Sequence, residues 1–295
     1  MKKFFGKNKI NILLYIKMIN ICIVGIGFVG GAMVKSLNLK GVTPILYDKY
    51  KNGGIGTQEE MLNTDVLFLC LPTLYSKENC EYDKSAIIEI CTYLNTHNYD
   101  GLVVLKSTIE PETTNILSRK LNLRIAHNPE FLTARTAFED FHNQEHIVLG
   151  KGINCTEDDM NKLEYFYSEH YPEAKISHGT SLETESMKIF CNSFYASKVM
   201  LFNEYYLLCQ KNGADFENIK EMMLNNKWIN PMHTNVPGPD GLLGYGGACF
   251  PKDTNALCKY MKKNGTENKV LNSVIEECNE VREEKIIMSD GKKYI

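Results

Sequence analysis

The sequence predicts an α/β protein, in which a doubly wound parallel sheet is followed by an all-α domain with one long helix. From residue 20 to about 180, short apolar runs alternate with helical stretches, as expected for strands that helices cover on both faces. From residue 181 onward, apolar positions recur at helical spacing instead. A chain of 295 residues, with 43% hydrophobic and 23% charged residues, has the length and composition of two globular domains.

The strands of the predicted sheet are short apolar runs rich in β-branched residues. In chain order they are Ile21–Val24, Pro44–Tyr47, Val66–Cys70, Leu102–Lys106, Leu123–Ala126 and His146–Leu149. The stretch from Asp48 to Asn63 is short for a full strand–helix crossover, so we expect the sheet to be trimmed there.

The predicted long helix begins at Ser181-Leu-Glu-Thr, continues to about Cys209 and ends at Asn212-Gly213. A helix of this length exceeds what one small domain needs, so we expect it to link domains or to pack against a second subunit. The expected elements after it are a helix around Phe216–Leu224, a Gly/Pro-rich loop from Asn230 to Gly247, and two helices ending near Lys285.

These patterns predict four segments: an extension over residues 1–17, a first domain over 18–180, a helical domain over 181–288 and a tail over 289–295. Met18 opens the apolar run MINICIVGIGFVG, which is a natural domain start. No small-residue cleavage site separates the basic residues 1–17 from that run, so a signal peptide is not expected.

Charge and cysteine usage exclude several classes of protein. A net charge of −3 gives no electrostatic case for a nucleic-acid partner. No apolar run approaches the roughly 18–20 residues that a membrane-spanning helix needs. The 10 cysteines are scattered, without a Cys-x-x-Cys pair or a Cys/His cluster, which indicates a reducing, cytoplasmic compartment and no metal site.

A glycine motif at Gly25-Ile-Gly27-Phe-Val-Gly30 indicates a dinucleotide site in a Rossmann-type domain. The motif follows an apolar strand and opens a helix, and Asp48 ends the next strand at the expected distance. An acid there binds a ribose 2′-hydroxyl and repels a 2′-phosphate, which favours NAD over NADP. The expected cofactor contacts are Gly25, Gly27, Phe28, Val29, Gly30 and Asp48.

A second motif, Gly244-Tyr-Gly-Gly-Ala-Cys249-Phe-Pro251-Lys-Asp253, indicates a nucleophile. Pro251 suits the first turn of a helix, which puts Cys249 just before a helix N-terminus and near Lys252. The helix N-terminus and the lysine ammonium both favour the thiolate form of the cysteine. The alternative is a buried structural cysteine, but such a thiol needs neither glycines nor charged neighbours.

Four other polar residues are candidates that the sequence leaves open. Lys188 and Asn192 share one face of the long helix, where an inward-pointing lysine would be desolvated and suited to act as a base. The alternative is an ordinary solvated lysine. Thr108 and Glu130 both follow apolar strands, at the strand ends where such sheets bind ligands, although either residue could also be a helix cap or a turn residue.

Six blocks in one order give the chain a specific resemblance. They are VGIGFVG, CLPT, KSTIEPETT, NPEFL, ETESMKIFCNSF with the later FNE, and GYGGACFPKDT, and together they extend from about Met18 to Glu284. In these blocks the chain resembles the UDP-glucose/GDP-mannose dehydrogenase family. The resemblance implies a two-step, four-electron oxidation of a nucleotide-sugar C6 alcohol to the uronic acid with two NAD and one water. The leading substrate is UDP-glucose, which would become UDP-glucuronate.

The resemblance also implies roles for the candidate residues. Lys188 and Asn192, with a water held by Thr108 and Asp253, would assist deprotonation and stabilise the developing oxyanion. Cys249 would form a thiohemiacetal and then a thioester.

Further roles follow from the same resemblance. Glu130 would orient or activate the hydrolytic water. Thr73, Thr108 and Lys252 match cofactor contacts. The residues implied to contact substrate are Glu130, Lys188, Asn192, Gly246 (through its backbone) and Cys249.

The chain departs from the family pattern in three places. Ala134 stands where the family has a second glutamate, and the arginine that many members carry in the loop before the cysteine is missing, with His233 near its position. The chain also stops at Ile295, without the further α/β domain of about a hundred residues that holds the nucleotide in typical members.

Two other functions are compatible with these residues. One is a 3-hydroxyacid or 6-phosphogluconate-type NAD(P) dehydrogenase, which pairs similar domains but needs no Cys249. The other is a non-catalytic NAD-binding subunit. Such a subunit would dimerise through the long helix with a full-length partner, whereas for the dehydrogenase the long helix predicts a homodimer.

Overall fold

The computed structural model describes residues 19–76, 78–79, 81–133, 135–282, 286–287 and 293–294. The chain forms two compact units. Unit 1 comprises Met1–Thr73 and Lys84–Ser186, and unit 2 comprises Leu74–Asp83 and Met187–Ile295. The units therefore divide after Ser186, and Leu74–Asp83 groups with unit 2. The predicted extension 1–17 lies outside the described residues, as does most of the tail 289–295.

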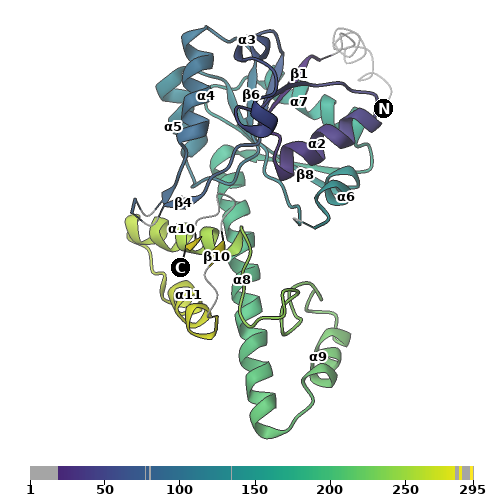
Figure 1. The fold of residues 1–295 in the computed structure, drawn as a ribbon, viewed down its shortest axis with the longest axis vertical. Helices are drawn as coiled ribbons and strands as arrows, with labels where there is room; N and C mark the ends of the chain where they lie inside the picture. Colours follow the sequence, from purple (N-terminus) through teal and green to yellow (C-terminus); the bar gives the residue numbers. More distant parts are fainter. Residues whose placement is uncertain are drawn as a thin grey trace, which may run out of the picture. The chain divides into compact units, whose positions relative to one another are not determined.

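Unit 1 is built on a seven-stranded sheet with the order β2-β1-β3-β6-β7-β8-β9 (Figure 1). Its strands are β1 (Ile21–Val24), β2 (Ile45–Tyr47), β3 (Val66–Leu69), β6 (Leu102–Leu105), β7 (Ile125–His127), β8 (His146–Lys151) and β9 (Lys175–Thr180). The predicted α/β architecture and all six predicted strands are confirmed.

The sheet differs from a wholly parallel one at a single pairing. β7 and β8 are antiparallel, with His127 opposite Gly150, and every other neighbouring pair is parallel. The chain between β7 and β8 contains only the short helix α6 (Ala137–His142), and it re-enters the sheet from the edge at which it left. β9 pairs with β8 at the end of the sheet and was not among the predicted strands.

Helices cover both faces of the sheet. They are α2 (Phe28–Leu39), α3 (Gln58–Met61), α4 (Ser85–Thr96), α5 (Thr113–Leu121), α6 and α7 (Glu157–His170), with a 3₁₀ turn η1 (Lys51–Gly53). Between β2 and β3 the chain forms only η1 and the one-turn α3, and the sheet ends at β2, so it is trimmed there as expected.

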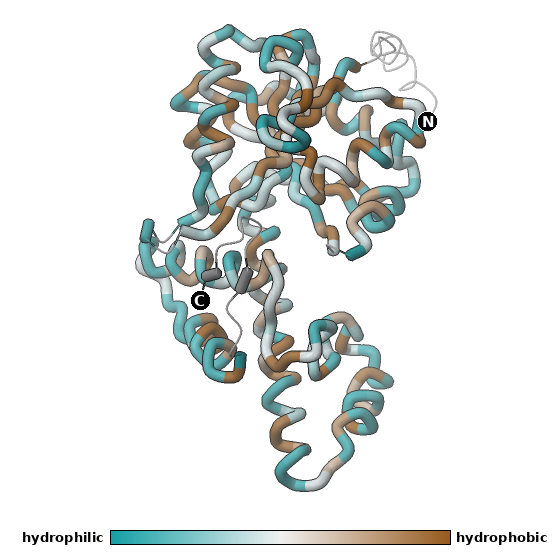
Figure 2. The backbone as a smooth tube through the Cα atoms, viewed as in Figure 1, coloured by the Kyte–Doolittle hydropathy of each residue, from teal (hydrophilic) through white to brown (hydrophobic). Residues whose placement is uncertain are grey.

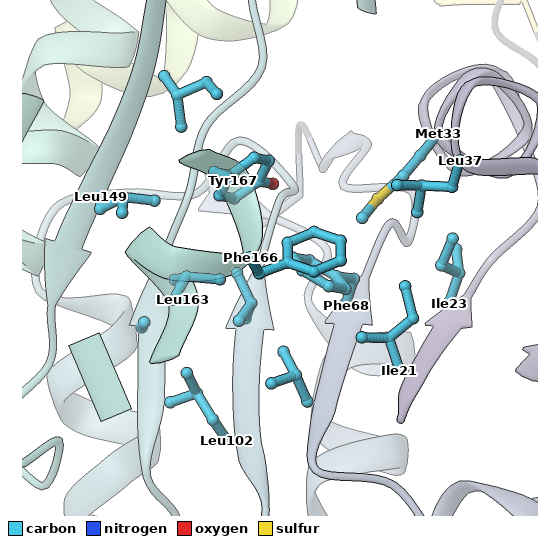
Figure 3. Packing of buried hydrophobic residues seen from close by; sticks show 14 of the residues in the cluster. Ile21, Ile23, Met33, Leu37, Phe68, Leu102, Leu149, Leu163, Phe166 and Tyr167 are labelled. Atoms are coloured by element: carbon cyan, nitrogen blue, oxygen red, sulfur yellow. The ribbon is translucent and has the colours of Figure 1, made fainter. Parts of the chain in front are cut away.

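Two apolar cores lie on opposite faces because successive side chains of a strand point in opposite directions. Ile23 of β1 and Phe68 of β3 belong to the core under α2 and α7, where Phe68 packs against Phe166 and Tyr167 (Figure 3). Val24 of β1 and its neighbours belong to the other core, under α4 and α5. Burial on both faces explains why the central strands contain almost no polar residue.

Unit 2 is mainly helical. Its helices are the part of α8 (Ser181–Asn212) from Met187 onward, α9 (Phe216–Asn225), α10 (Phe250–Lys263) and α11 (Lys269–Val281). Its strands form two small hairpins, β4 (Tyr75–Ser76) with β5 (Glu81–Tyr82) and β10 (Ile286–Ile287) with β11 (Lys293–Tyr294). The predicted helices are confirmed, including α8 and its end at Asn212. In Figure 2, hydrophobic (brown) and hydrophilic (teal) residues alternate along these helices. Among the described helices, none combines the length and the apolar character that crossing a membrane requires.

Candidate active site

The glycine turn between β1 and α2 requires glycine at two positions. Gly25 has a φ of 87°, and a Cβ there would lie 2.6 Å from the carbonyl oxygen of Cys70. A Cβ on Gly30 would overlap the carbonyl oxygen of Gly25 and lie 3.1 Å from its carbonyl carbon. Both neighbours are backbone atoms, which cannot rotate away, so the turn exists only with glycines.

The middle glycine of the turn fits the pyrophosphate of a dinucleotide. Gly27 is the N-cap residue of α2, and a Cβ built on it meets no atom within 4 Å. The space beside it is therefore open at a helix N-terminus, where N–H groups and the helix dipole favour an anion. Of its neighbours, Phe28 leaves 70% of its surface exposed and Val29 is half-buried.

Asp48 follows β2 and is bonded to the same turn. Its Oδ2 accepts the N–H of Ile26 at 2.7 Å, and its Oδ1 accepts those of Tyr50 and Lys51 at 3.0 and 2.9 Å. Partial burial alone would raise the pKa of Asp48, but the backbone N–H donors outweigh it and hold the pKa below its usual value. The carboxylate is thus ionised and fixed beside the turn, as ribose recognition requires.

Thr73 and Thr108 join two loops at the carboxyl ends of neighbouring strands. Thr73 follows β3 and donates its hydroxyl to the carbonyl oxygen of Thr108, which follows β6, at 2.7 Å. Both side chains are buried. Because β1, β3, β6 and β7 are parallel neighbours, these loops share one edge of the sheet with the glycine turn, as predicted for this fold class.

Glu130 follows β7 at that edge and is half-buried, with its Oε2 accepting the N–H of Leu132 at 2.6 Å. The loop that carries it is held by Asn128, whose Oδ1 accepts the buried ammonium of Lys106 at 2.8 Å and the hydroxyl of Tyr167. Unit 1 therefore brings Thr73, Thr108 and Glu130 to the edge that holds the glycine turn, as the sequence predicted. Ala134 lies outside the described residues.

Asp253, in the first turn of α10, is the centre of a polar cluster in unit 2. Its side chain is fully buried. Oδ2 accepts the side-chain amide of Asn192 at 2.5 Å, and Oδ1 accepts the ammonium of Lys252 at 2.6 Å. Lys188, one turn before Asn192 on α8, is buried as well, so the alternative of an ordinary solvated lysine is excluded.

The sequence did not single out a third partner of Asp253. The hydroxyl of Tyr82, on β5, donates to Asp253 Oδ1 at 2.5 Å, and the Lys252 ammonium lies 4.6 Å from the centre of the Tyr82 ring. Lys252, predicted as a cofactor contact, thus binds the carboxylate next to it. Tyr82 lies 171 residues before Asp253, and no local pattern could have indicated the pairing.

Cys249 is the N-cap residue of α10, one turn before Asp253, and Pro251 lies in the first turn as predicted. Of the nine cysteines in the described part of the chain, it alone is exposed. Burial raises the pKa of Cys22, Cys91 and Cys155 to about 12, so those thiols are inert at neutral pH. Cys249, by contrast, is exposed at the N-terminus of a 14-residue helix.

His233 lies in the loop before the glycine-rich segment. Its ring centre is 5.1 Å from that of Tyr195 and 5.3 Å from that of Phe250. Burial, and secondarily the charge of Lys198, lowers the pKa of His233, so the imidazole is neutral at pH 7 and does not carry the charge of the arginine that the resemblance places here.

No group of three His, Cys, Asp or Glu side chains suited to a metal occurs among the residues described.

Two models of one family match the chain in sequence. The NAD-binding domain of the UDP-glucose/GDP-mannose dehydrogenase family matches residues 49–170, and the central domain of the same family matches residues 182–280. The two matches follow the order of the chain and cover most of it.

Curated relatives with similar sequences carry one activity in their names. The UDP-glucose 6-dehydrogenase of Rickettsia bellii is 36% identical over 224 residues, which is 74% of this chain and 50% of that protein. The UDP-glucose 6-dehydrogenase of Haloferax volcanii is 30% identical over 233 residues, or 74% of this chain and 53% of that one. The chain thus spans about half the length of the curated relatives it matches.

Solved structures share the fold. A UDP-glucose dehydrogenase from Pyrobaculum islandicum aligns with a TM-score of 0.76 at 24% identity, covering 89% of this chain and 68% of that one. A 3-hydroxyisobutyrate dehydrogenase from Mycobacterium tuberculosis aligns with a TM-score of 0.70 at 17% identity, covering 89% and 93%. The fold is therefore common to both kinds of enzyme, whereas the sequence matches are specific: the chain belongs to the UDP-glucose/GDP-mannose dehydrogenase family, with its NAD-binding and central domains.

Proposed function

We propose that the chain is an NAD-dependent nucleotide-sugar 6-dehydrogenase that oxidises the C6 alcohol of a sugar to a carboxylate, with UDP-glucose as the first substrate to test. The observation that carries the proposal is the exposed thiol of Cys249, at a helix N-terminus and one turn from the Asp253–Asn192 pair. A simple alcohol dehydrogenase needs no nucleophilic thiol, whereas oxidation through the aldehyde to the acid is helped by one.

In the first oxidation, the C6 alcohol loses its hydroxyl proton and a hydride (a proton with two electrons) from C6 and becomes an aldehyde. NAD, when bound by the glycine turn and Asp48, supplies the electron acceptor. The buried Lys188 and Asn192 would take part in the deprotonation and donate to the developing alkoxide. Asp253 holds the Asn192 amide, and Thr108 would help to bind the water through which the proton leaves.

In the second oxidation, the Cys249 thiolate would add to the aldehyde carbon and give a thiohemiacetal. Removal of a hydride from C6 and of the hydroxyl proton leaves a thioester, which water cleaves to the carboxylate and the free thiol. Glu130, held by the N–H of Leu132, would orient that water and accept its proton.

The direct test is the substitution Cys249→Ser in the full chain, with NAD and UDP-glucose. We expect acid formation to fall by at least about 10³-fold, because a serine hydroxyl is un-ionised at neutral pH and forms no thioester. Cys258→Ser, in the same helix, is the matched control, because Cys258 is buried away from solvent and its thiol is hydrogen-bonded to Asn268 and Asn272, bonds that a hydroxyl can form as well. If both variants make acid at the wild-type rate, the proposal is wrong.

A 3-hydroxyacid dehydrogenase is the second candidate, because the fold matches nearly the whole length of the 3-hydroxyisobutyrate enzyme. Such an activity would transfer two electrons per substrate and would be unaffected by Cys249→Ser. A chain that reduces NAD with 3-hydroxyacids and not with nucleotide sugars would replace the first proposal by this one.

We infer that the working form is a homodimer that pairs through α8. The helix is 32 residues long, and Phe190, Phe194, Leu201, Tyr205 and Leu208 recur along it at helical spacing with exposed side chains. Phe190 and Phe194 also line an open groove of about 620 Å³ that α10 and α11 complete within unit 2. A continuous apolar face of this length is best covered by the same face of a second copy.

Light scattering at micromolar concentration tests the dimer. We expect twice the chain mass for the wild type and the chain mass for Phe194→Asp, because a buried carboxylate without a partner destabilises the interface. Ile116→Asp, at an exposed position of α5, is the matched control and should leave the mass unchanged. A wild-type monomer at these concentrations would contradict the dimer.

A further inference from the structure

The glycine bed, residues Leu243–Gly247 ahead of Cys249, is held by a side chain that follows α11. Arg282, the C-cap residue of that helix, is mostly buried. Its Nη1 donates to the carbonyl oxygens of Leu243 at 3.1 Å and Gly244 at 3.3 Å, and its Nη2 pairs with the carboxylate of Asp240. One guanidinium thus joins Asp240 to the backbone at Leu243 and Gly244, where the loop enters the bed.

The same guanidinium lies directly against Gly246. A Cβ built on Gly246 would lie 2.5 Å from Cζ and 2.9 Å from Nε of Arg282, well inside van der Waals contact. A flexible side chain could move aside, but this one is tied to two carbonyls and a carboxylate. An alanine at position 246 therefore cannot fit without breaking those bonds.

Two further contacts fix the bed from its other sides. The N–H of Gly244 donates to Oδ1 of the buried Asn203 of α8 at 2.9 Å. Cys278 of α11 donates its thiol to the carbonyl oxygen of Tyr245 at 3.3 Å. The backbone polar groups ahead of Cys249 are thus bonded to side chains of α8 and α11 and to Arg282, which is the charged donor of this set.

The ion pair keeps the guanidinium in place. Partial burial alone would raise the pKa of Asp240, but the hydrogen bond and charge of Arg282 outweigh it and lower the pKa. Asp240 is therefore ionised at neutral pH. A hydrogen bond from a guanidinium to an ionised carboxylate is stronger than a bond between neutral groups.

We propose that Arg282 is a positioning residue for Cys249: by bonding Leu243 and Gly244 and packing on Gly246, it fixes the backbone from which the nucleophile enters α10. The inference rests on the proposed function for its meaning in catalysis. Gly246 is also the residue that the family resemblance assigns to sugar contact, so the same bonds would set the substrate's position. Arg282 would therefore act on catalysis through the backbone that it bonds, not by contacting the substrate.

A double-variant cycle with Arg282→Met, Gly246→Ala and the pair tests the inference without any substrate. The measurement is the rate at which iodoacetamide alkylates Cys249 between pH 6 and 9, followed by peptide mass spectrometry. We expect each single variant to slow alkylation at pH 7 by at least about threefold, because a freed bed lets the thiol leave the helix N-terminus that favours the thiolate. General unfolding would be recognised by the opposite change, because it would speed the alkylation of the buried cysteines.

The pair decides the question. Because methionine leaves room for the alanine Cβ, adding Gly246→Ala to Arg282→Met should change the rate by less than about 1.5-fold. Independent effects that multiply would overturn the inference. Asp240→Asn, at a partly exposed position, gives a milder loss of the same bonds if Arg282→Met does not fold, and it should slow alkylation in the same direction.

Kinetics separate this inference from the proposed function. With UDP-glucose, Arg282→Met should raise KM by about tenfold and leave kcat within about threefold, and Arg282→Lys should restore part of the loss. Arg119→Met, at an exposed position of α5, is the matched control and should change neither constant. If the chain forms acid but the two substitutions slow alkylation independently, so that their effects multiply, only the role of Arg282 is overturned. If the pair slows alkylation no more than Arg282→Met alone but the chain forms no acid, only the proposed function is overturned.

Discussion

Two glycine-rich segments carry the candidate chemistry, and different atoms force glycine on each. In unit 1, a Cβ on Gly25 or Gly30 would meet backbone atoms of Cys70 or Gly25. In unit 2, a Cβ on Gly246 would meet the side chain of Arg282. The first segment is therefore fixed by how strand and helix backbones pack. The second depends on what a distant helix end supplies, so its shape can be altered and restored by changing another residue.

The largest difference is expected from Gly30→Ala. The added methyl meets the Gly25 carbonyl, so we expect a loss of about 3 kcal/mol in unfolding free energy and a drop in NAD affinity of more than roughly tenfold. No second substitution of a side chain should restore either value, in contrast to Gly246→Ala. Urea unfolding and NAD titration measure the two effects.

Gly31→Ala is the matched control for that variant. A Cβ there would lie 3.8 Å from the Ile26 carbonyl oxygen, which is ordinary contact, and alanine favours helix. We expect unchanged or slightly higher stability. Equal losses in the two variants would show that the close approach at Gly30 does not decide the effect.

Glu185 is a third case, a side chain of α8 that holds the N-terminal backbone of α5 in unit 1. Its carboxylate accepts the N–H groups of Glu112 and Thr114 at 2.6 and 2.8 Å. Burial raises the pKa of Glu185 to about 7 despite these bonds. The folded state therefore gains stability as the pH falls through 7 towards the unfolded value of about 4.3.

The matching variant is Glu185→Gln. Between about pH 8 and pH 5, the wild type should gain on the order of 2 kcal/mol of unfolding free energy relative to the variant, measured by urea unfolding. A difference that stays constant across this range would mean that the carboxyl does not titrate there.

The smallest effect is expected from Tyr82→Phe. Its hydroxyl shares Asp253 Oδ1 with Lys252, so the carboxylate keeps a partner when the hydroxyl is removed. We expect a cost of about 1 kcal/mol in unfolding free energy. Tyr93→Phe, on α4, should change stability by less than about 0.5 kcal/mol. A loss of several kcal/mol in Tyr82→Phe would mean that this tyrosine is the main support of Asp253.

Elements with strong local signals were predictable from the sequence. The six apolar runs became strands, and five of them are mostly buried on both faces, whereas β2 is half-buried at the edge of the sheet. α8 ends where Asn212-Gly213 interrupts its pattern. β9 was missed because its sequence, KISHGT, contains a single large apolar residue, Ile176, and the strand is half-exposed at the edge of the sheet. The antiparallel entry of β8 was missed because strand direction depends on tertiary packing rather than on any residue within it.

The candidate site divides in the same way. Gly25, Gly30 and Asp48 could be found because their spacing along the chain reflects one strand–helix–strand unit. Tyr82 and Arg282 could not, since each meets its partner across a long stretch of chain. For such residues, the sequence offers a residue type and no indication of its contact.

The most direct test of the central claim is the number of NADH formed per sugar consumed when the purified chain meets NAD and UDP-glucose. The four-electron route through Cys249 predicts about two NADH per sugar, with the uronic acid as the product. About one NADH per sugar, with an aldehyde or ketone as the product, would contradict it.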